Sequence, residues 1–159
     1  MSMYCEIRKL KKSETGLLER FLYLAIFVPE GTEPPPYDIV KKPELRVYTD
    51  GFYEDEADMA FLAVKDGRPI GAAWARIMDD YGHIDDNTPS LAVSVVEGHR
   101  GKGTGTALLT ALINELREQG YGRVSLSVQK ANRAFGLYKR LGFVTVREDE
   151  EEAVMARYL

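Results

Sequence analysis

The chain has 159 residues, of which 45% are hydrophobic and 29% charged, and this composition is typical of one globular domain with a sizeable core. Its formal net charge of -4 disfavours a dedicated nucleic-acid binder, because such proteins usually carry a net basic surface. A single cysteine, Cys5, excludes an internal disulfide and a cysteine-based metal cluster, and the sequence shows neither a signal peptide nor a membrane-spanning run. We therefore expect one cytoplasmic domain over residues 1–159 that acts on small molecules, with no metal, nucleic acid or membrane partner.

The chain opens with a predicted strand and a predicted helix. Residues 4–10, YCEIRKL, have the character of a short strand, in which Cys5 serves as a small buried hydrophobe. Apolar residues then recur at helical spacing over residues 12–27, and Ser13 is the expected N-cap.

A proline-rich stretch separates this entry from a predicted hairpin. Prolines break all periodicity over residues 28–43, so we expect an ordered loop with one helical turn near Ile39, followed by another short helix within residues 43–52. Two apolar runs flank Asp66 and Gly67, a pair that is typical of a tight β-turn. The two runs are therefore predicted to be antiparallel strands.

The second half alternates strands and helices, with glycines at the ends of the helices. The expected elements are a polar connector at 79–89, a strand at 90–96, a helix ending at Gly120, a strand at 123–128, a helix over 132–141 stopped by Gly142, and two strands around the solvated acidic turn 148–152. No internal repeat or low-complexity tract appears.

Residues 97–105, EGHRGKGTG, place four glycines and two cations between a strand and a helix. Glycines of this kind let a backbone approach a ligand, and the first amides of a helix favour an anion. A P-loop is excluded because Lys102 is followed by Gly103 rather than by serine or threonine. A dinucleotide fingerprint is disfavoured because its third glycine position holds Thr106. The remaining pattern is Arg-x-x-Gly-x-Gly, and a glycine-rich connection without a ligand is the alternative.

This pattern, formed by Arg100, Gly103 and Gly105, resembles the central motif of the GNAT superfamily of acetyl-CoA-dependent N-acyltransferases. A second stretch, NRAFGLYKRLGF, is similar to the family's Asn-x-x-Ala-x-x-Leu-Tyr-x-x-x-Gly-Phe, with Ala134 shifted. The resemblance covers most of the chain and is densest from Leu91 to Phe143. It implies a mixed α/β (α+β) domain whose mostly antiparallel sheet of six to seven strands has a central splayed parallel pair and about four flanking helices.

The resemblance also implies that the protein binds acetyl-CoA and no metal. It assigns the contacts with acetyl-CoA to particular residues. The expected cofactor contacts are Val93, Ser94, Val95, Arg100, Gly101, Lys102, Gly103, Thr104, Gly105, Thr106, Asn132 and Tyr138. In the family the loop amides hold the pyrophosphate, while backbone groups of the splayed strand bind the pantetheine arm and face the acyl oxygen. Without the adjacent loop, residues 91–96 would be typical of an ordinary buried strand.

The resemblance implies that Tyr138 is the general acid for the departing thiolate, with Val95 and Glu97 completing the expected catalytic group. Tyr138 also lies at helical spacing from Ala134 and Leu141, so a purely structural core tyrosine is the competing interpretation. Asn132 is expected both to cap the same helix and to touch coenzyme A.

The base that deprotonates the amine is not singled out by spacing. The candidates are Asp80, His83, Asp85, Asp86 and Glu97, together with an ordered water. His83 is typical of a surface loop, and Asp85 and Asp86 are typical turn formers. Glu97 is favoured because it ends the central strand.

These features predict an N-acetyltransferase that moves an acetyl group from acetyl-CoA to a primary amine of a small molecule or peptide by direct attack. The alternative is a GNAT-fold module that binds acyl-CoA without turnover, and a nucleotide-binding regulator is a more distant one. The acceptor is expected to contact the proline-rich loop, where Tyr37 offers an aromatic face. The sequence does not decide between a monomer and a homodimer.

Overall fold

The computed structural model describes residues 4–159, which form a seven-stranded sheet in the order β1-β2-β3-β4-β5-β7-β6. The strands are β1 (Glu6–Lys9), β2 (Met59–Lys65), β3 (Arg68–Arg76), β4 (Ser90–Val95), β5 (Arg123–Gln129), β6 (Val144–Glu148) and β7 (Glu152–Tyr158). The only parallel neighbours within this part of the chain are β4 and β5, at the centre of the sheet. The predicted sheet, mostly antiparallel with a central parallel pair, is therefore confirmed.

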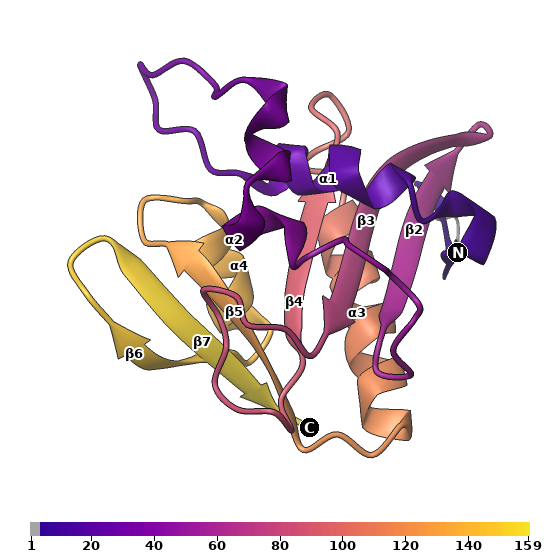
Figure 1. Ribbon diagram of the computed structural model, residues 1–159. Helices are drawn as coiled ribbons and strands as arrows, with labels where there is room; N and C mark the ends of the chain where they lie inside the picture. The colour runs from indigo at the N-terminus through magenta and orange to yellow at the C-terminus, as the bar shows by residue number, and fades with distance from the viewer. Residues whose placement is uncertain (1–3) are drawn as a thin grey trace.

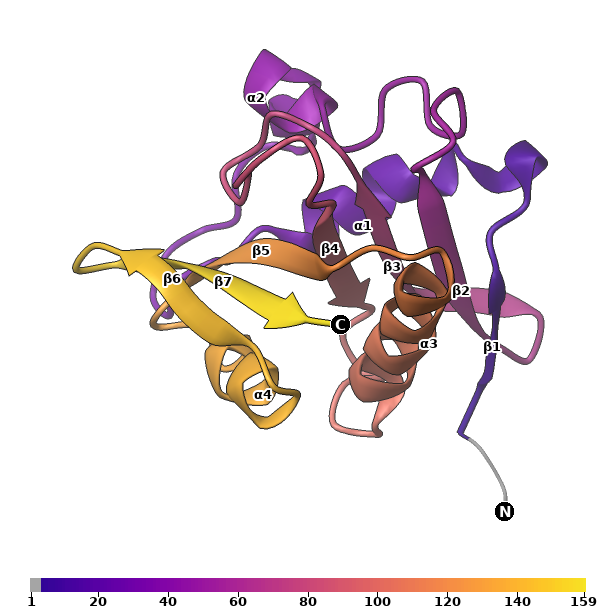
Figure 2. The same cartoon turned by 90° about the horizontal axis from the view of Figure 1, so that it is seen from below.

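Four α-helices cover the sheet, two on each face (Figures 1 and 2). The helices are α1 (Leu17–Ala25), α2 (Pro43–Arg46), α3 (Thr104–Glu118) and α4 (Ala134–Arg140). Figure 2 shows α1 and α2 above the sheet and α3 and α4 below it. Two short 3-10 turns, η1 (Lys12–Glu14) and η2 (Tyr37–Lys41), lie before α1 and before α2. The expected helical turn near Ile39 is η2.

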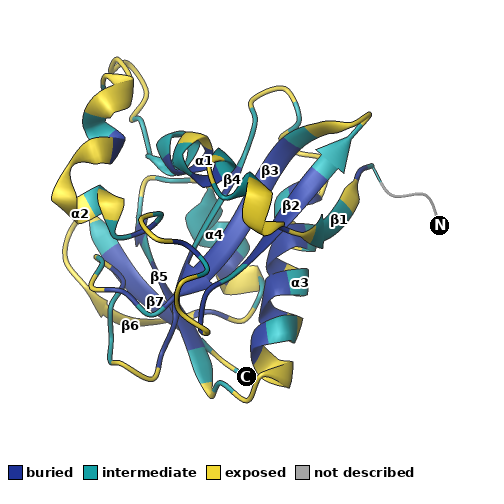
Figure 3. Ribbon diagram, turned by 45° about the vertical axis from the view of Figure 1, so that its right-hand side comes forward, coloured by how far each residue is buried: buried dark blue, intermediate teal, exposed yellow. Residues whose placement is uncertain are grey.

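Each face of the sheet has its own core. On the α3 face, Leu108, Leu112 and Leu116 are fully buried against the strands, at the spacing of one helix stripe. On the α1 face, Phe21 and Trp74 belong to a second buried cluster. Figure 3 shows the buried residues concentrated on the central strands and along α3, with exposed residues on α2 and the loops. The strand β4 is thus packed from both sides, and both cores support it.

The local turn chemistry follows the sequence in most places. Asp66 and Gly67 have φ of 51° and 76°, as a two-residue hairpin turn requires, and they join β2 to β3. The helices α3 and α4 end at Gly120 and Gly142, both with φ of 91°. The amides of Tyr121 and Phe143 bond the carbonyls of Leu116 and Tyr138, closing both helix ends.

The prediction that Ser13 caps the first helix is wrong. The carboxylate of Glu14 accepts the backbone amide of Lys11 at 2.8 Å and both terminal nitrogens of Arg8, each at 2.8 Å. These bonds hold residues 12–14 in a separate 3-10 turn, and α1 begins only after Gly16. Within residues 4–159 no helix is both long and apolar enough to cross a membrane.

Candidate active site

A gap between β4 and β5 is the central feature of the candidate site. In the described chain the two strands share one paired position, Ser90 with Ser125, where the Ser125 amide bonds the Pro89 carbonyl at 2.9 Å. Beyond that position they diverge toward their C-terminal ends (Figure 1). Backbone groups of β4 that point toward β5 are therefore available to an extended ligand, as in the predicted splayed pair.

The loop after β4 forms an open cradle at the start of α3. Gly98, Gly101 and Gly103 have φ of 93°, 76° and 83°, a region that residues with a Cβ rarely adopt. No atom lies within 4 Å of the position that a Cβ would occupy at any of these three glycines. Gly103 is the N-cap of α3 and supplies no capping side chain, so the first amides of a 15-residue helix face open space. This geometry fits a phosphate group of coenzyme A.

The charged and hydroxylated residues of the loop differ in where their side chains point. Lys102 and Thr106 are exposed, so they can reach a bound anion. Arg100 folds back, and its Nε donates to the carbonyl of Val95 at 2.9 Å. Thr104 is buried, with its hydroxyl 3.9 Å from the sulfur of Cys5, so only its backbone amide is offered to a ligand. The buried position of Cys5 confirms the expectation of a small interior hydrophobe.

The residues of β4 that were expected to bind the pantetheine arm lie at the C-terminal half of the strand. Their pairing with β3 holds one edge of the backbone, because Val93 lies opposite Ala73 and Val95 opposite Gly71. The side chains of Val93 and Val95 pack on the α3 face. Ser94 points to the other face, where its hydroxyl donates to the carbonyl of Phe21 in α1 at 2.7 Å.

The second motif places α4 beside the cradle. The nearest atom to a Cβ built on Gly105 is the Cδ2 of Leu137, at 4.0 Å, so the starts of α3 and α4 are neighbours. Asn132 lies one residue before the N-cap of α4, Arg133, and its side-chain oxygen accepts the Ala134 amide at 2.9 Å. Counting back from Tyr138, Ala134 stands where the family pattern has alanine, and Asn132 stands one residue closer to the tyrosine than the pattern does.

Tyr138 is buried on the inner face of α4, and its ring lies 5.7 Å from that of Phe143. Burial raises the pKa of Tyr138 to about 12, so the phenol stays protonated at neutral pH. Among the hydrogen bonds of the described residues none engages its hydroxyl, which leaves the O–H available as a donor.

The five candidate bases have different surroundings in the structure. The Thr88 hydroxyl and then Arg123, at 2.7 Å, lower the pKa of Asp85, which makes that carboxylate a weak base. His83 donates from Nδ1 to the Met78 carbonyl at 2.9 Å, and its Nε2 lies 3.6 Å from the exposed Asp86. Glu97 is exposed in the loop beyond β4.

Asp80 differs from these four because its carboxylate lies inside the protein. Its Oδ1 accepts the hydroxyl of Ser90, the residue that pairs β4 with β5, at 2.7 Å. The side chain of Tyr48 is also buried here, beside Asp80 and Ser127. The sequence around Tyr48 gives no sign that this residue belongs to the site. Only the folding of distant segments onto the gap reveals this group.

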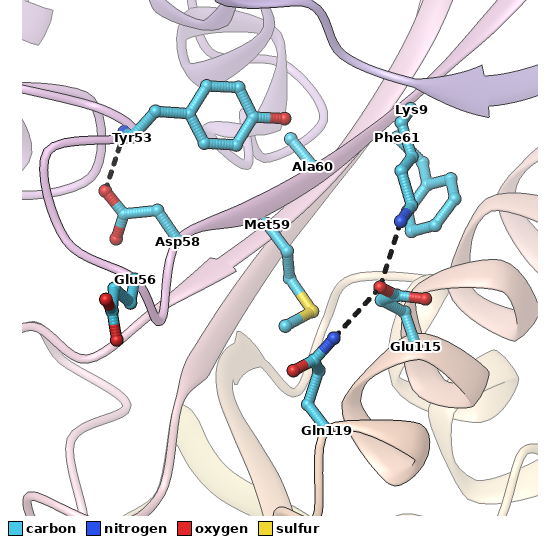
Figure 4. A pocket seen from close by; sticks show the side chains of 9 residues that line it. All are labelled: Lys9, Tyr53, Glu56, Asp58, Met59, Ala60, Phe61, Glu115 and Gln119. Carbon is cyan, nitrogen blue, oxygen red and sulfur yellow. Dashed lines mark hydrogen bonds and ion pairs between the residues drawn. The ribbon is translucent and has the colours of Figure 1, made fainter.

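A separate hollow of about 180 Å³ lies at the other end of α3 (Figure 4). Its lining carries Glu56, Asp58 and Glu115 beside Lys9, whose Nζ bonds Glu115 at 3.0 Å. Nothing from the two motifs reaches it, and the described residues hold no group of three His, Cys, Asp or Glu side chains suited to a metal ion.

Comparison with known proteins supports the interpretation of the motifs. The model of the acetyltransferase (GNAT) family matches residues 22–143, which is more than half of the chain. The chain belongs to the GNAT family. The matched segment contains the end of α1, the gap between β4 and β5, the glycine cradle and the second motif.

Curated GNAT relatives match part of their own length. A mycothiol acetyltransferase of Thermomonospora curvata is 36% identical over 90 residues, covering 56% of this chain and 29% of the relative. N-acetyltransferase 8B of Homo sapiens is 27% identical over 107 residues, covering 67% of this chain and 47% of the relative. The chain thus spans less than half the length of these relatives.

Solved GNAT structures match nearly the whole chain. A GNAT-family acetyltransferase from Staphylococcus aureus superposes with a TM-score of 0.71 and 20% identity, covering 97% of this chain and 98% of the other. The PaiA N-acetyltransferase of Thermoplasma acidophilum, solved in complex with coenzyme A, has a TM-score of 0.68 at 20% identity and full coverage of both chains. These likenesses show the fold.

Proposed function

We propose that this chain is an N-acetyltransferase that transfers an acetyl group from acetyl-CoA to a primary amine of a small molecule or peptide. One observation carries the proposal. The open cradle of positive-φ glycines and the uncapped start of α3 lie at the end of β4, beside a gap in the sheet that leaves its backbone available. Acetyl-CoA supplies the thioester, and the residues of the site bind and orient acetyl-CoA and the amine.

The loop and the strand hold the donor in two parts. Amides of residues 101–106, with Lys102, bind the pyrophosphate, while backbone groups of Val93 and Val95, which alternate with those of Ser94 on the β3 side, pair with the pantetheine arm. The backbone amide of Val93 or of Val95 faces the acyl oxygen and stabilises the negative charge that develops there when the amine attacks. Glu97, in the loop after β4, stays a predicted catalytic residue to which no step is assigned.

Tyr138 acts on the departing sulfur in this proposal. A phenol whose pKa is about 12 cannot give its proton fully to a thiolate whose conjugate thiol has a pKa near 8.5, since that transfer is uphill by several pK units. It can donate a hydrogen bond to the sulfur as the C–S bond breaks, which favours the transition state over the bound thioester. Asn132 holds the start of α4 through its bond to the Ala134 amide.

The burial of Tyr138 also favours the second candidate function, a module that binds acyl-CoA without turnover. A tyrosine packed on Phe143 at a ring distance of 5.7 Å has a structural reason to be present. Thiol release from acetyl-CoA, measured with a panel of primary amines, separates the two. Amine-dependent release supports the enzyme, and binding of acetyl-CoA without release for any amine supports the module.

The acceptor is proposed to reach the gap from the face that carries α1 and α2, because α3 and α4 hold the donor on the other (Figure 2). On that side the loop before α2 carries Tyr37, whose ring lies 5.1 Å from Tyr23, and the Tyr23 hydroxyl bonds the Pro35 carbonyl at 2.6 Å. Composition and charge supply the remaining expectations of a cytoplasmic protein without nucleic-acid or membrane partners.

A further inference from the structure

The connector between β3 and β4 inserts a carboxylate into the widening gap between β4 and β5. Gly82 lies against β5 so closely that a Cβ there would come within 3.0 Å of the backbone at Leu126 and Ser127. The Gly82 carbonyl accepts the Ser125 hydroxyl at 2.7 Å, and Asp80 accepts the Ser90 hydroxyl at the same distance. The connector is therefore fixed to both strands at the point where they part.

One carboxylate oxygen of Asp80 accepts a hydrogen bond, and the other accepts none. Of the buried side-chain nitrogen and oxygen atoms within residues 4–159, Oδ2 of Asp80 is the one that has no hydrogen-bond partner. A buried carboxylate oxygen left in this state is costly, because it has lost water without gaining a donor. Such an atom is available to a donor on a ligand.

The surroundings of Asp80 favour proton acceptance. Burial raises the pKa of Asp80, and the hydroxyls of Ser90 and Tyr48 offset part of that rise. Burial and then the Asp80 carboxylate raise the pKa of Tyr48. Tyr81 is a further titratable group that acts on this pair, raising the pKa of Tyr48. Tyr48 is therefore a neutral hydrogen-bond donor at neutral pH.

Asp80 also lies on the face from which the proposed acceptor arrives. Ser90, Ala92 and Ser94 alternate with the residues of β4 that pack on α3, and Ser94 bonds α1. Ser90 precedes Val93, one of the two β4 residues whose amides can face the acyl oxygen, by three residues, or about 10 Å along a strand. That length accommodates an acyl group and an attacking amine, with at most one bridging water to the carboxylate.

We infer that Asp80 is the general base of the reaction and binds the primary ammonium group of the acceptor through its spare oxygen. The inference rests on the proposed function. One N–H proton of the ammonium passes to Oδ2, the freed nitrogen pair forms the C–N bond, and the C–S bond breaks with its electrons leaving on sulfur. The new amide nitrogen loses its second proton, which reaches the thiolate through water, and Asp80 returns its proton to solvent. Tyr48 positions the carboxylate and does not touch the amine.

The test compares Asp80→Asn with Asp79→Asn, which removes the same charge from the exposed neighbouring residue. At pH 7 Asp80→Asn should lower kcat/KM for the amine by about 10² to 10⁴, and Asp79→Asn should stay within twofold of wild type. The deficit of Asp80→Asn should shrink as the pH approaches the amine pKa near 10, because a neutral amine needs no base. Acetyl-CoA affinity, measured by calorimetry, should be unchanged, which shows that the variant is folded.

A second variant tests the assignment without removing the base. Tyr48→Phe deletes a hydroxyl that lowers the pKa of Asp80, so the acidic limb of kcat/KM should move to higher pH. An unmoved limb, or an Asp80→Asn profile that superimposes on that of Asp79→Asn, overturns the inference while the proposed function stands. Absence of amine-dependent thiol release by the wild-type protein overturns the proposed function and the inference together.

Discussion

Replacing Gly105 by valine should separate cofactor binding from stability. Gly105 lies in the first turn of α3 with ordinary helical backbone angles, and the nearest neighbour of an added Cβ is 4.0 Å away. The Cβ of valine therefore clashes with no protein atom, and its better helix propensity offsets the cost of packing its methyl groups beside Leu137. We expect the melting temperature to stay within about 2 °C of wild type, since the change in unfolding free energy is well below 1 kcal/mol.

Acetyl-CoA binding should fall sharply in the same variant. The branched side chain occupies the open space above the amides, so the pyrophosphate loses one or two charge-assisted hydrogen bonds worth roughly 1.5–3 kcal/mol each. A loss of about 2–4 kcal/mol corresponds to roughly 30- to 1,000-fold in Kd. Isothermal titration calorimetry measures this change in the Kd for acetyl-CoA. Gly122→Val is the control, because a Cβ at Gly122 also meets open space but lies outside the cradle. Unchanged affinity in Gly105→Val would refute the placement of the cradle.

Three further predictions concern the acid, the acceptor side and the pH dependence of stability. Tyr138→Phe should lower kcat about 10²-fold with acetyl-CoA affinity within a few fold, because only a transition-state contact is lost; an unchanged kcat from pH 6 to 9 contradicts the role. Tyr37→Ala should raise KM for the acceptor at constant acetyl-CoA affinity, and an acceptor KM and kcat both equal to wild type would make the loop a simple surface crossing. Arg8 and the Lys11 amide lower the pKa of Glu14 to about 2, so Glu14→Gln should destabilise at pH 7 and converge with wild type in denaturant unfolding as the pH falls from about 4.5 to 2.

The sequence predicts those parts of this protein that depend on local backbone chemistry. The Asp66–Gly67 hairpin and the glycine ends of α3 and α4 follow from positive φ, which few other residues tolerate. Apolar runs identify the central strands, which are buried on both faces, and helical spacing identifies α3, which buries one face. Ser13 does not cap the first helix, because the bonds of Glu14 to Arg8 and to the Lys11 amide hold residues 12–14 in a separate 3-10 turn.

The acceptor side of the site could not be predicted because tertiary contacts create it. The connector that carries Asp80 is held by bonds from Arg123 to Thr88 and from Ser125 to Gly82, across 35 and 43 residues. In sequence Asp80 was one of several acidic residues before β4, with no spacing to distinguish it from Glu97. Burial, the unpartnered Oδ2 and the approach of Tyr48 distinguish it only in the folded chain.

The most direct test of the account is amine-dependent release of free thiol from acetyl-CoA by the purified chain, followed with a thiol reagent across a panel of primary amines. The account predicts release that saturates with acetyl-CoA and with at least one amine, is lost in Gly105→Val, and is accompanied by a rise in melting temperature when acetyl-CoA alone is added. A protein that shows neither release with any amine nor a shift with acetyl-CoA or coenzyme A at millimolar concentration would contradict it.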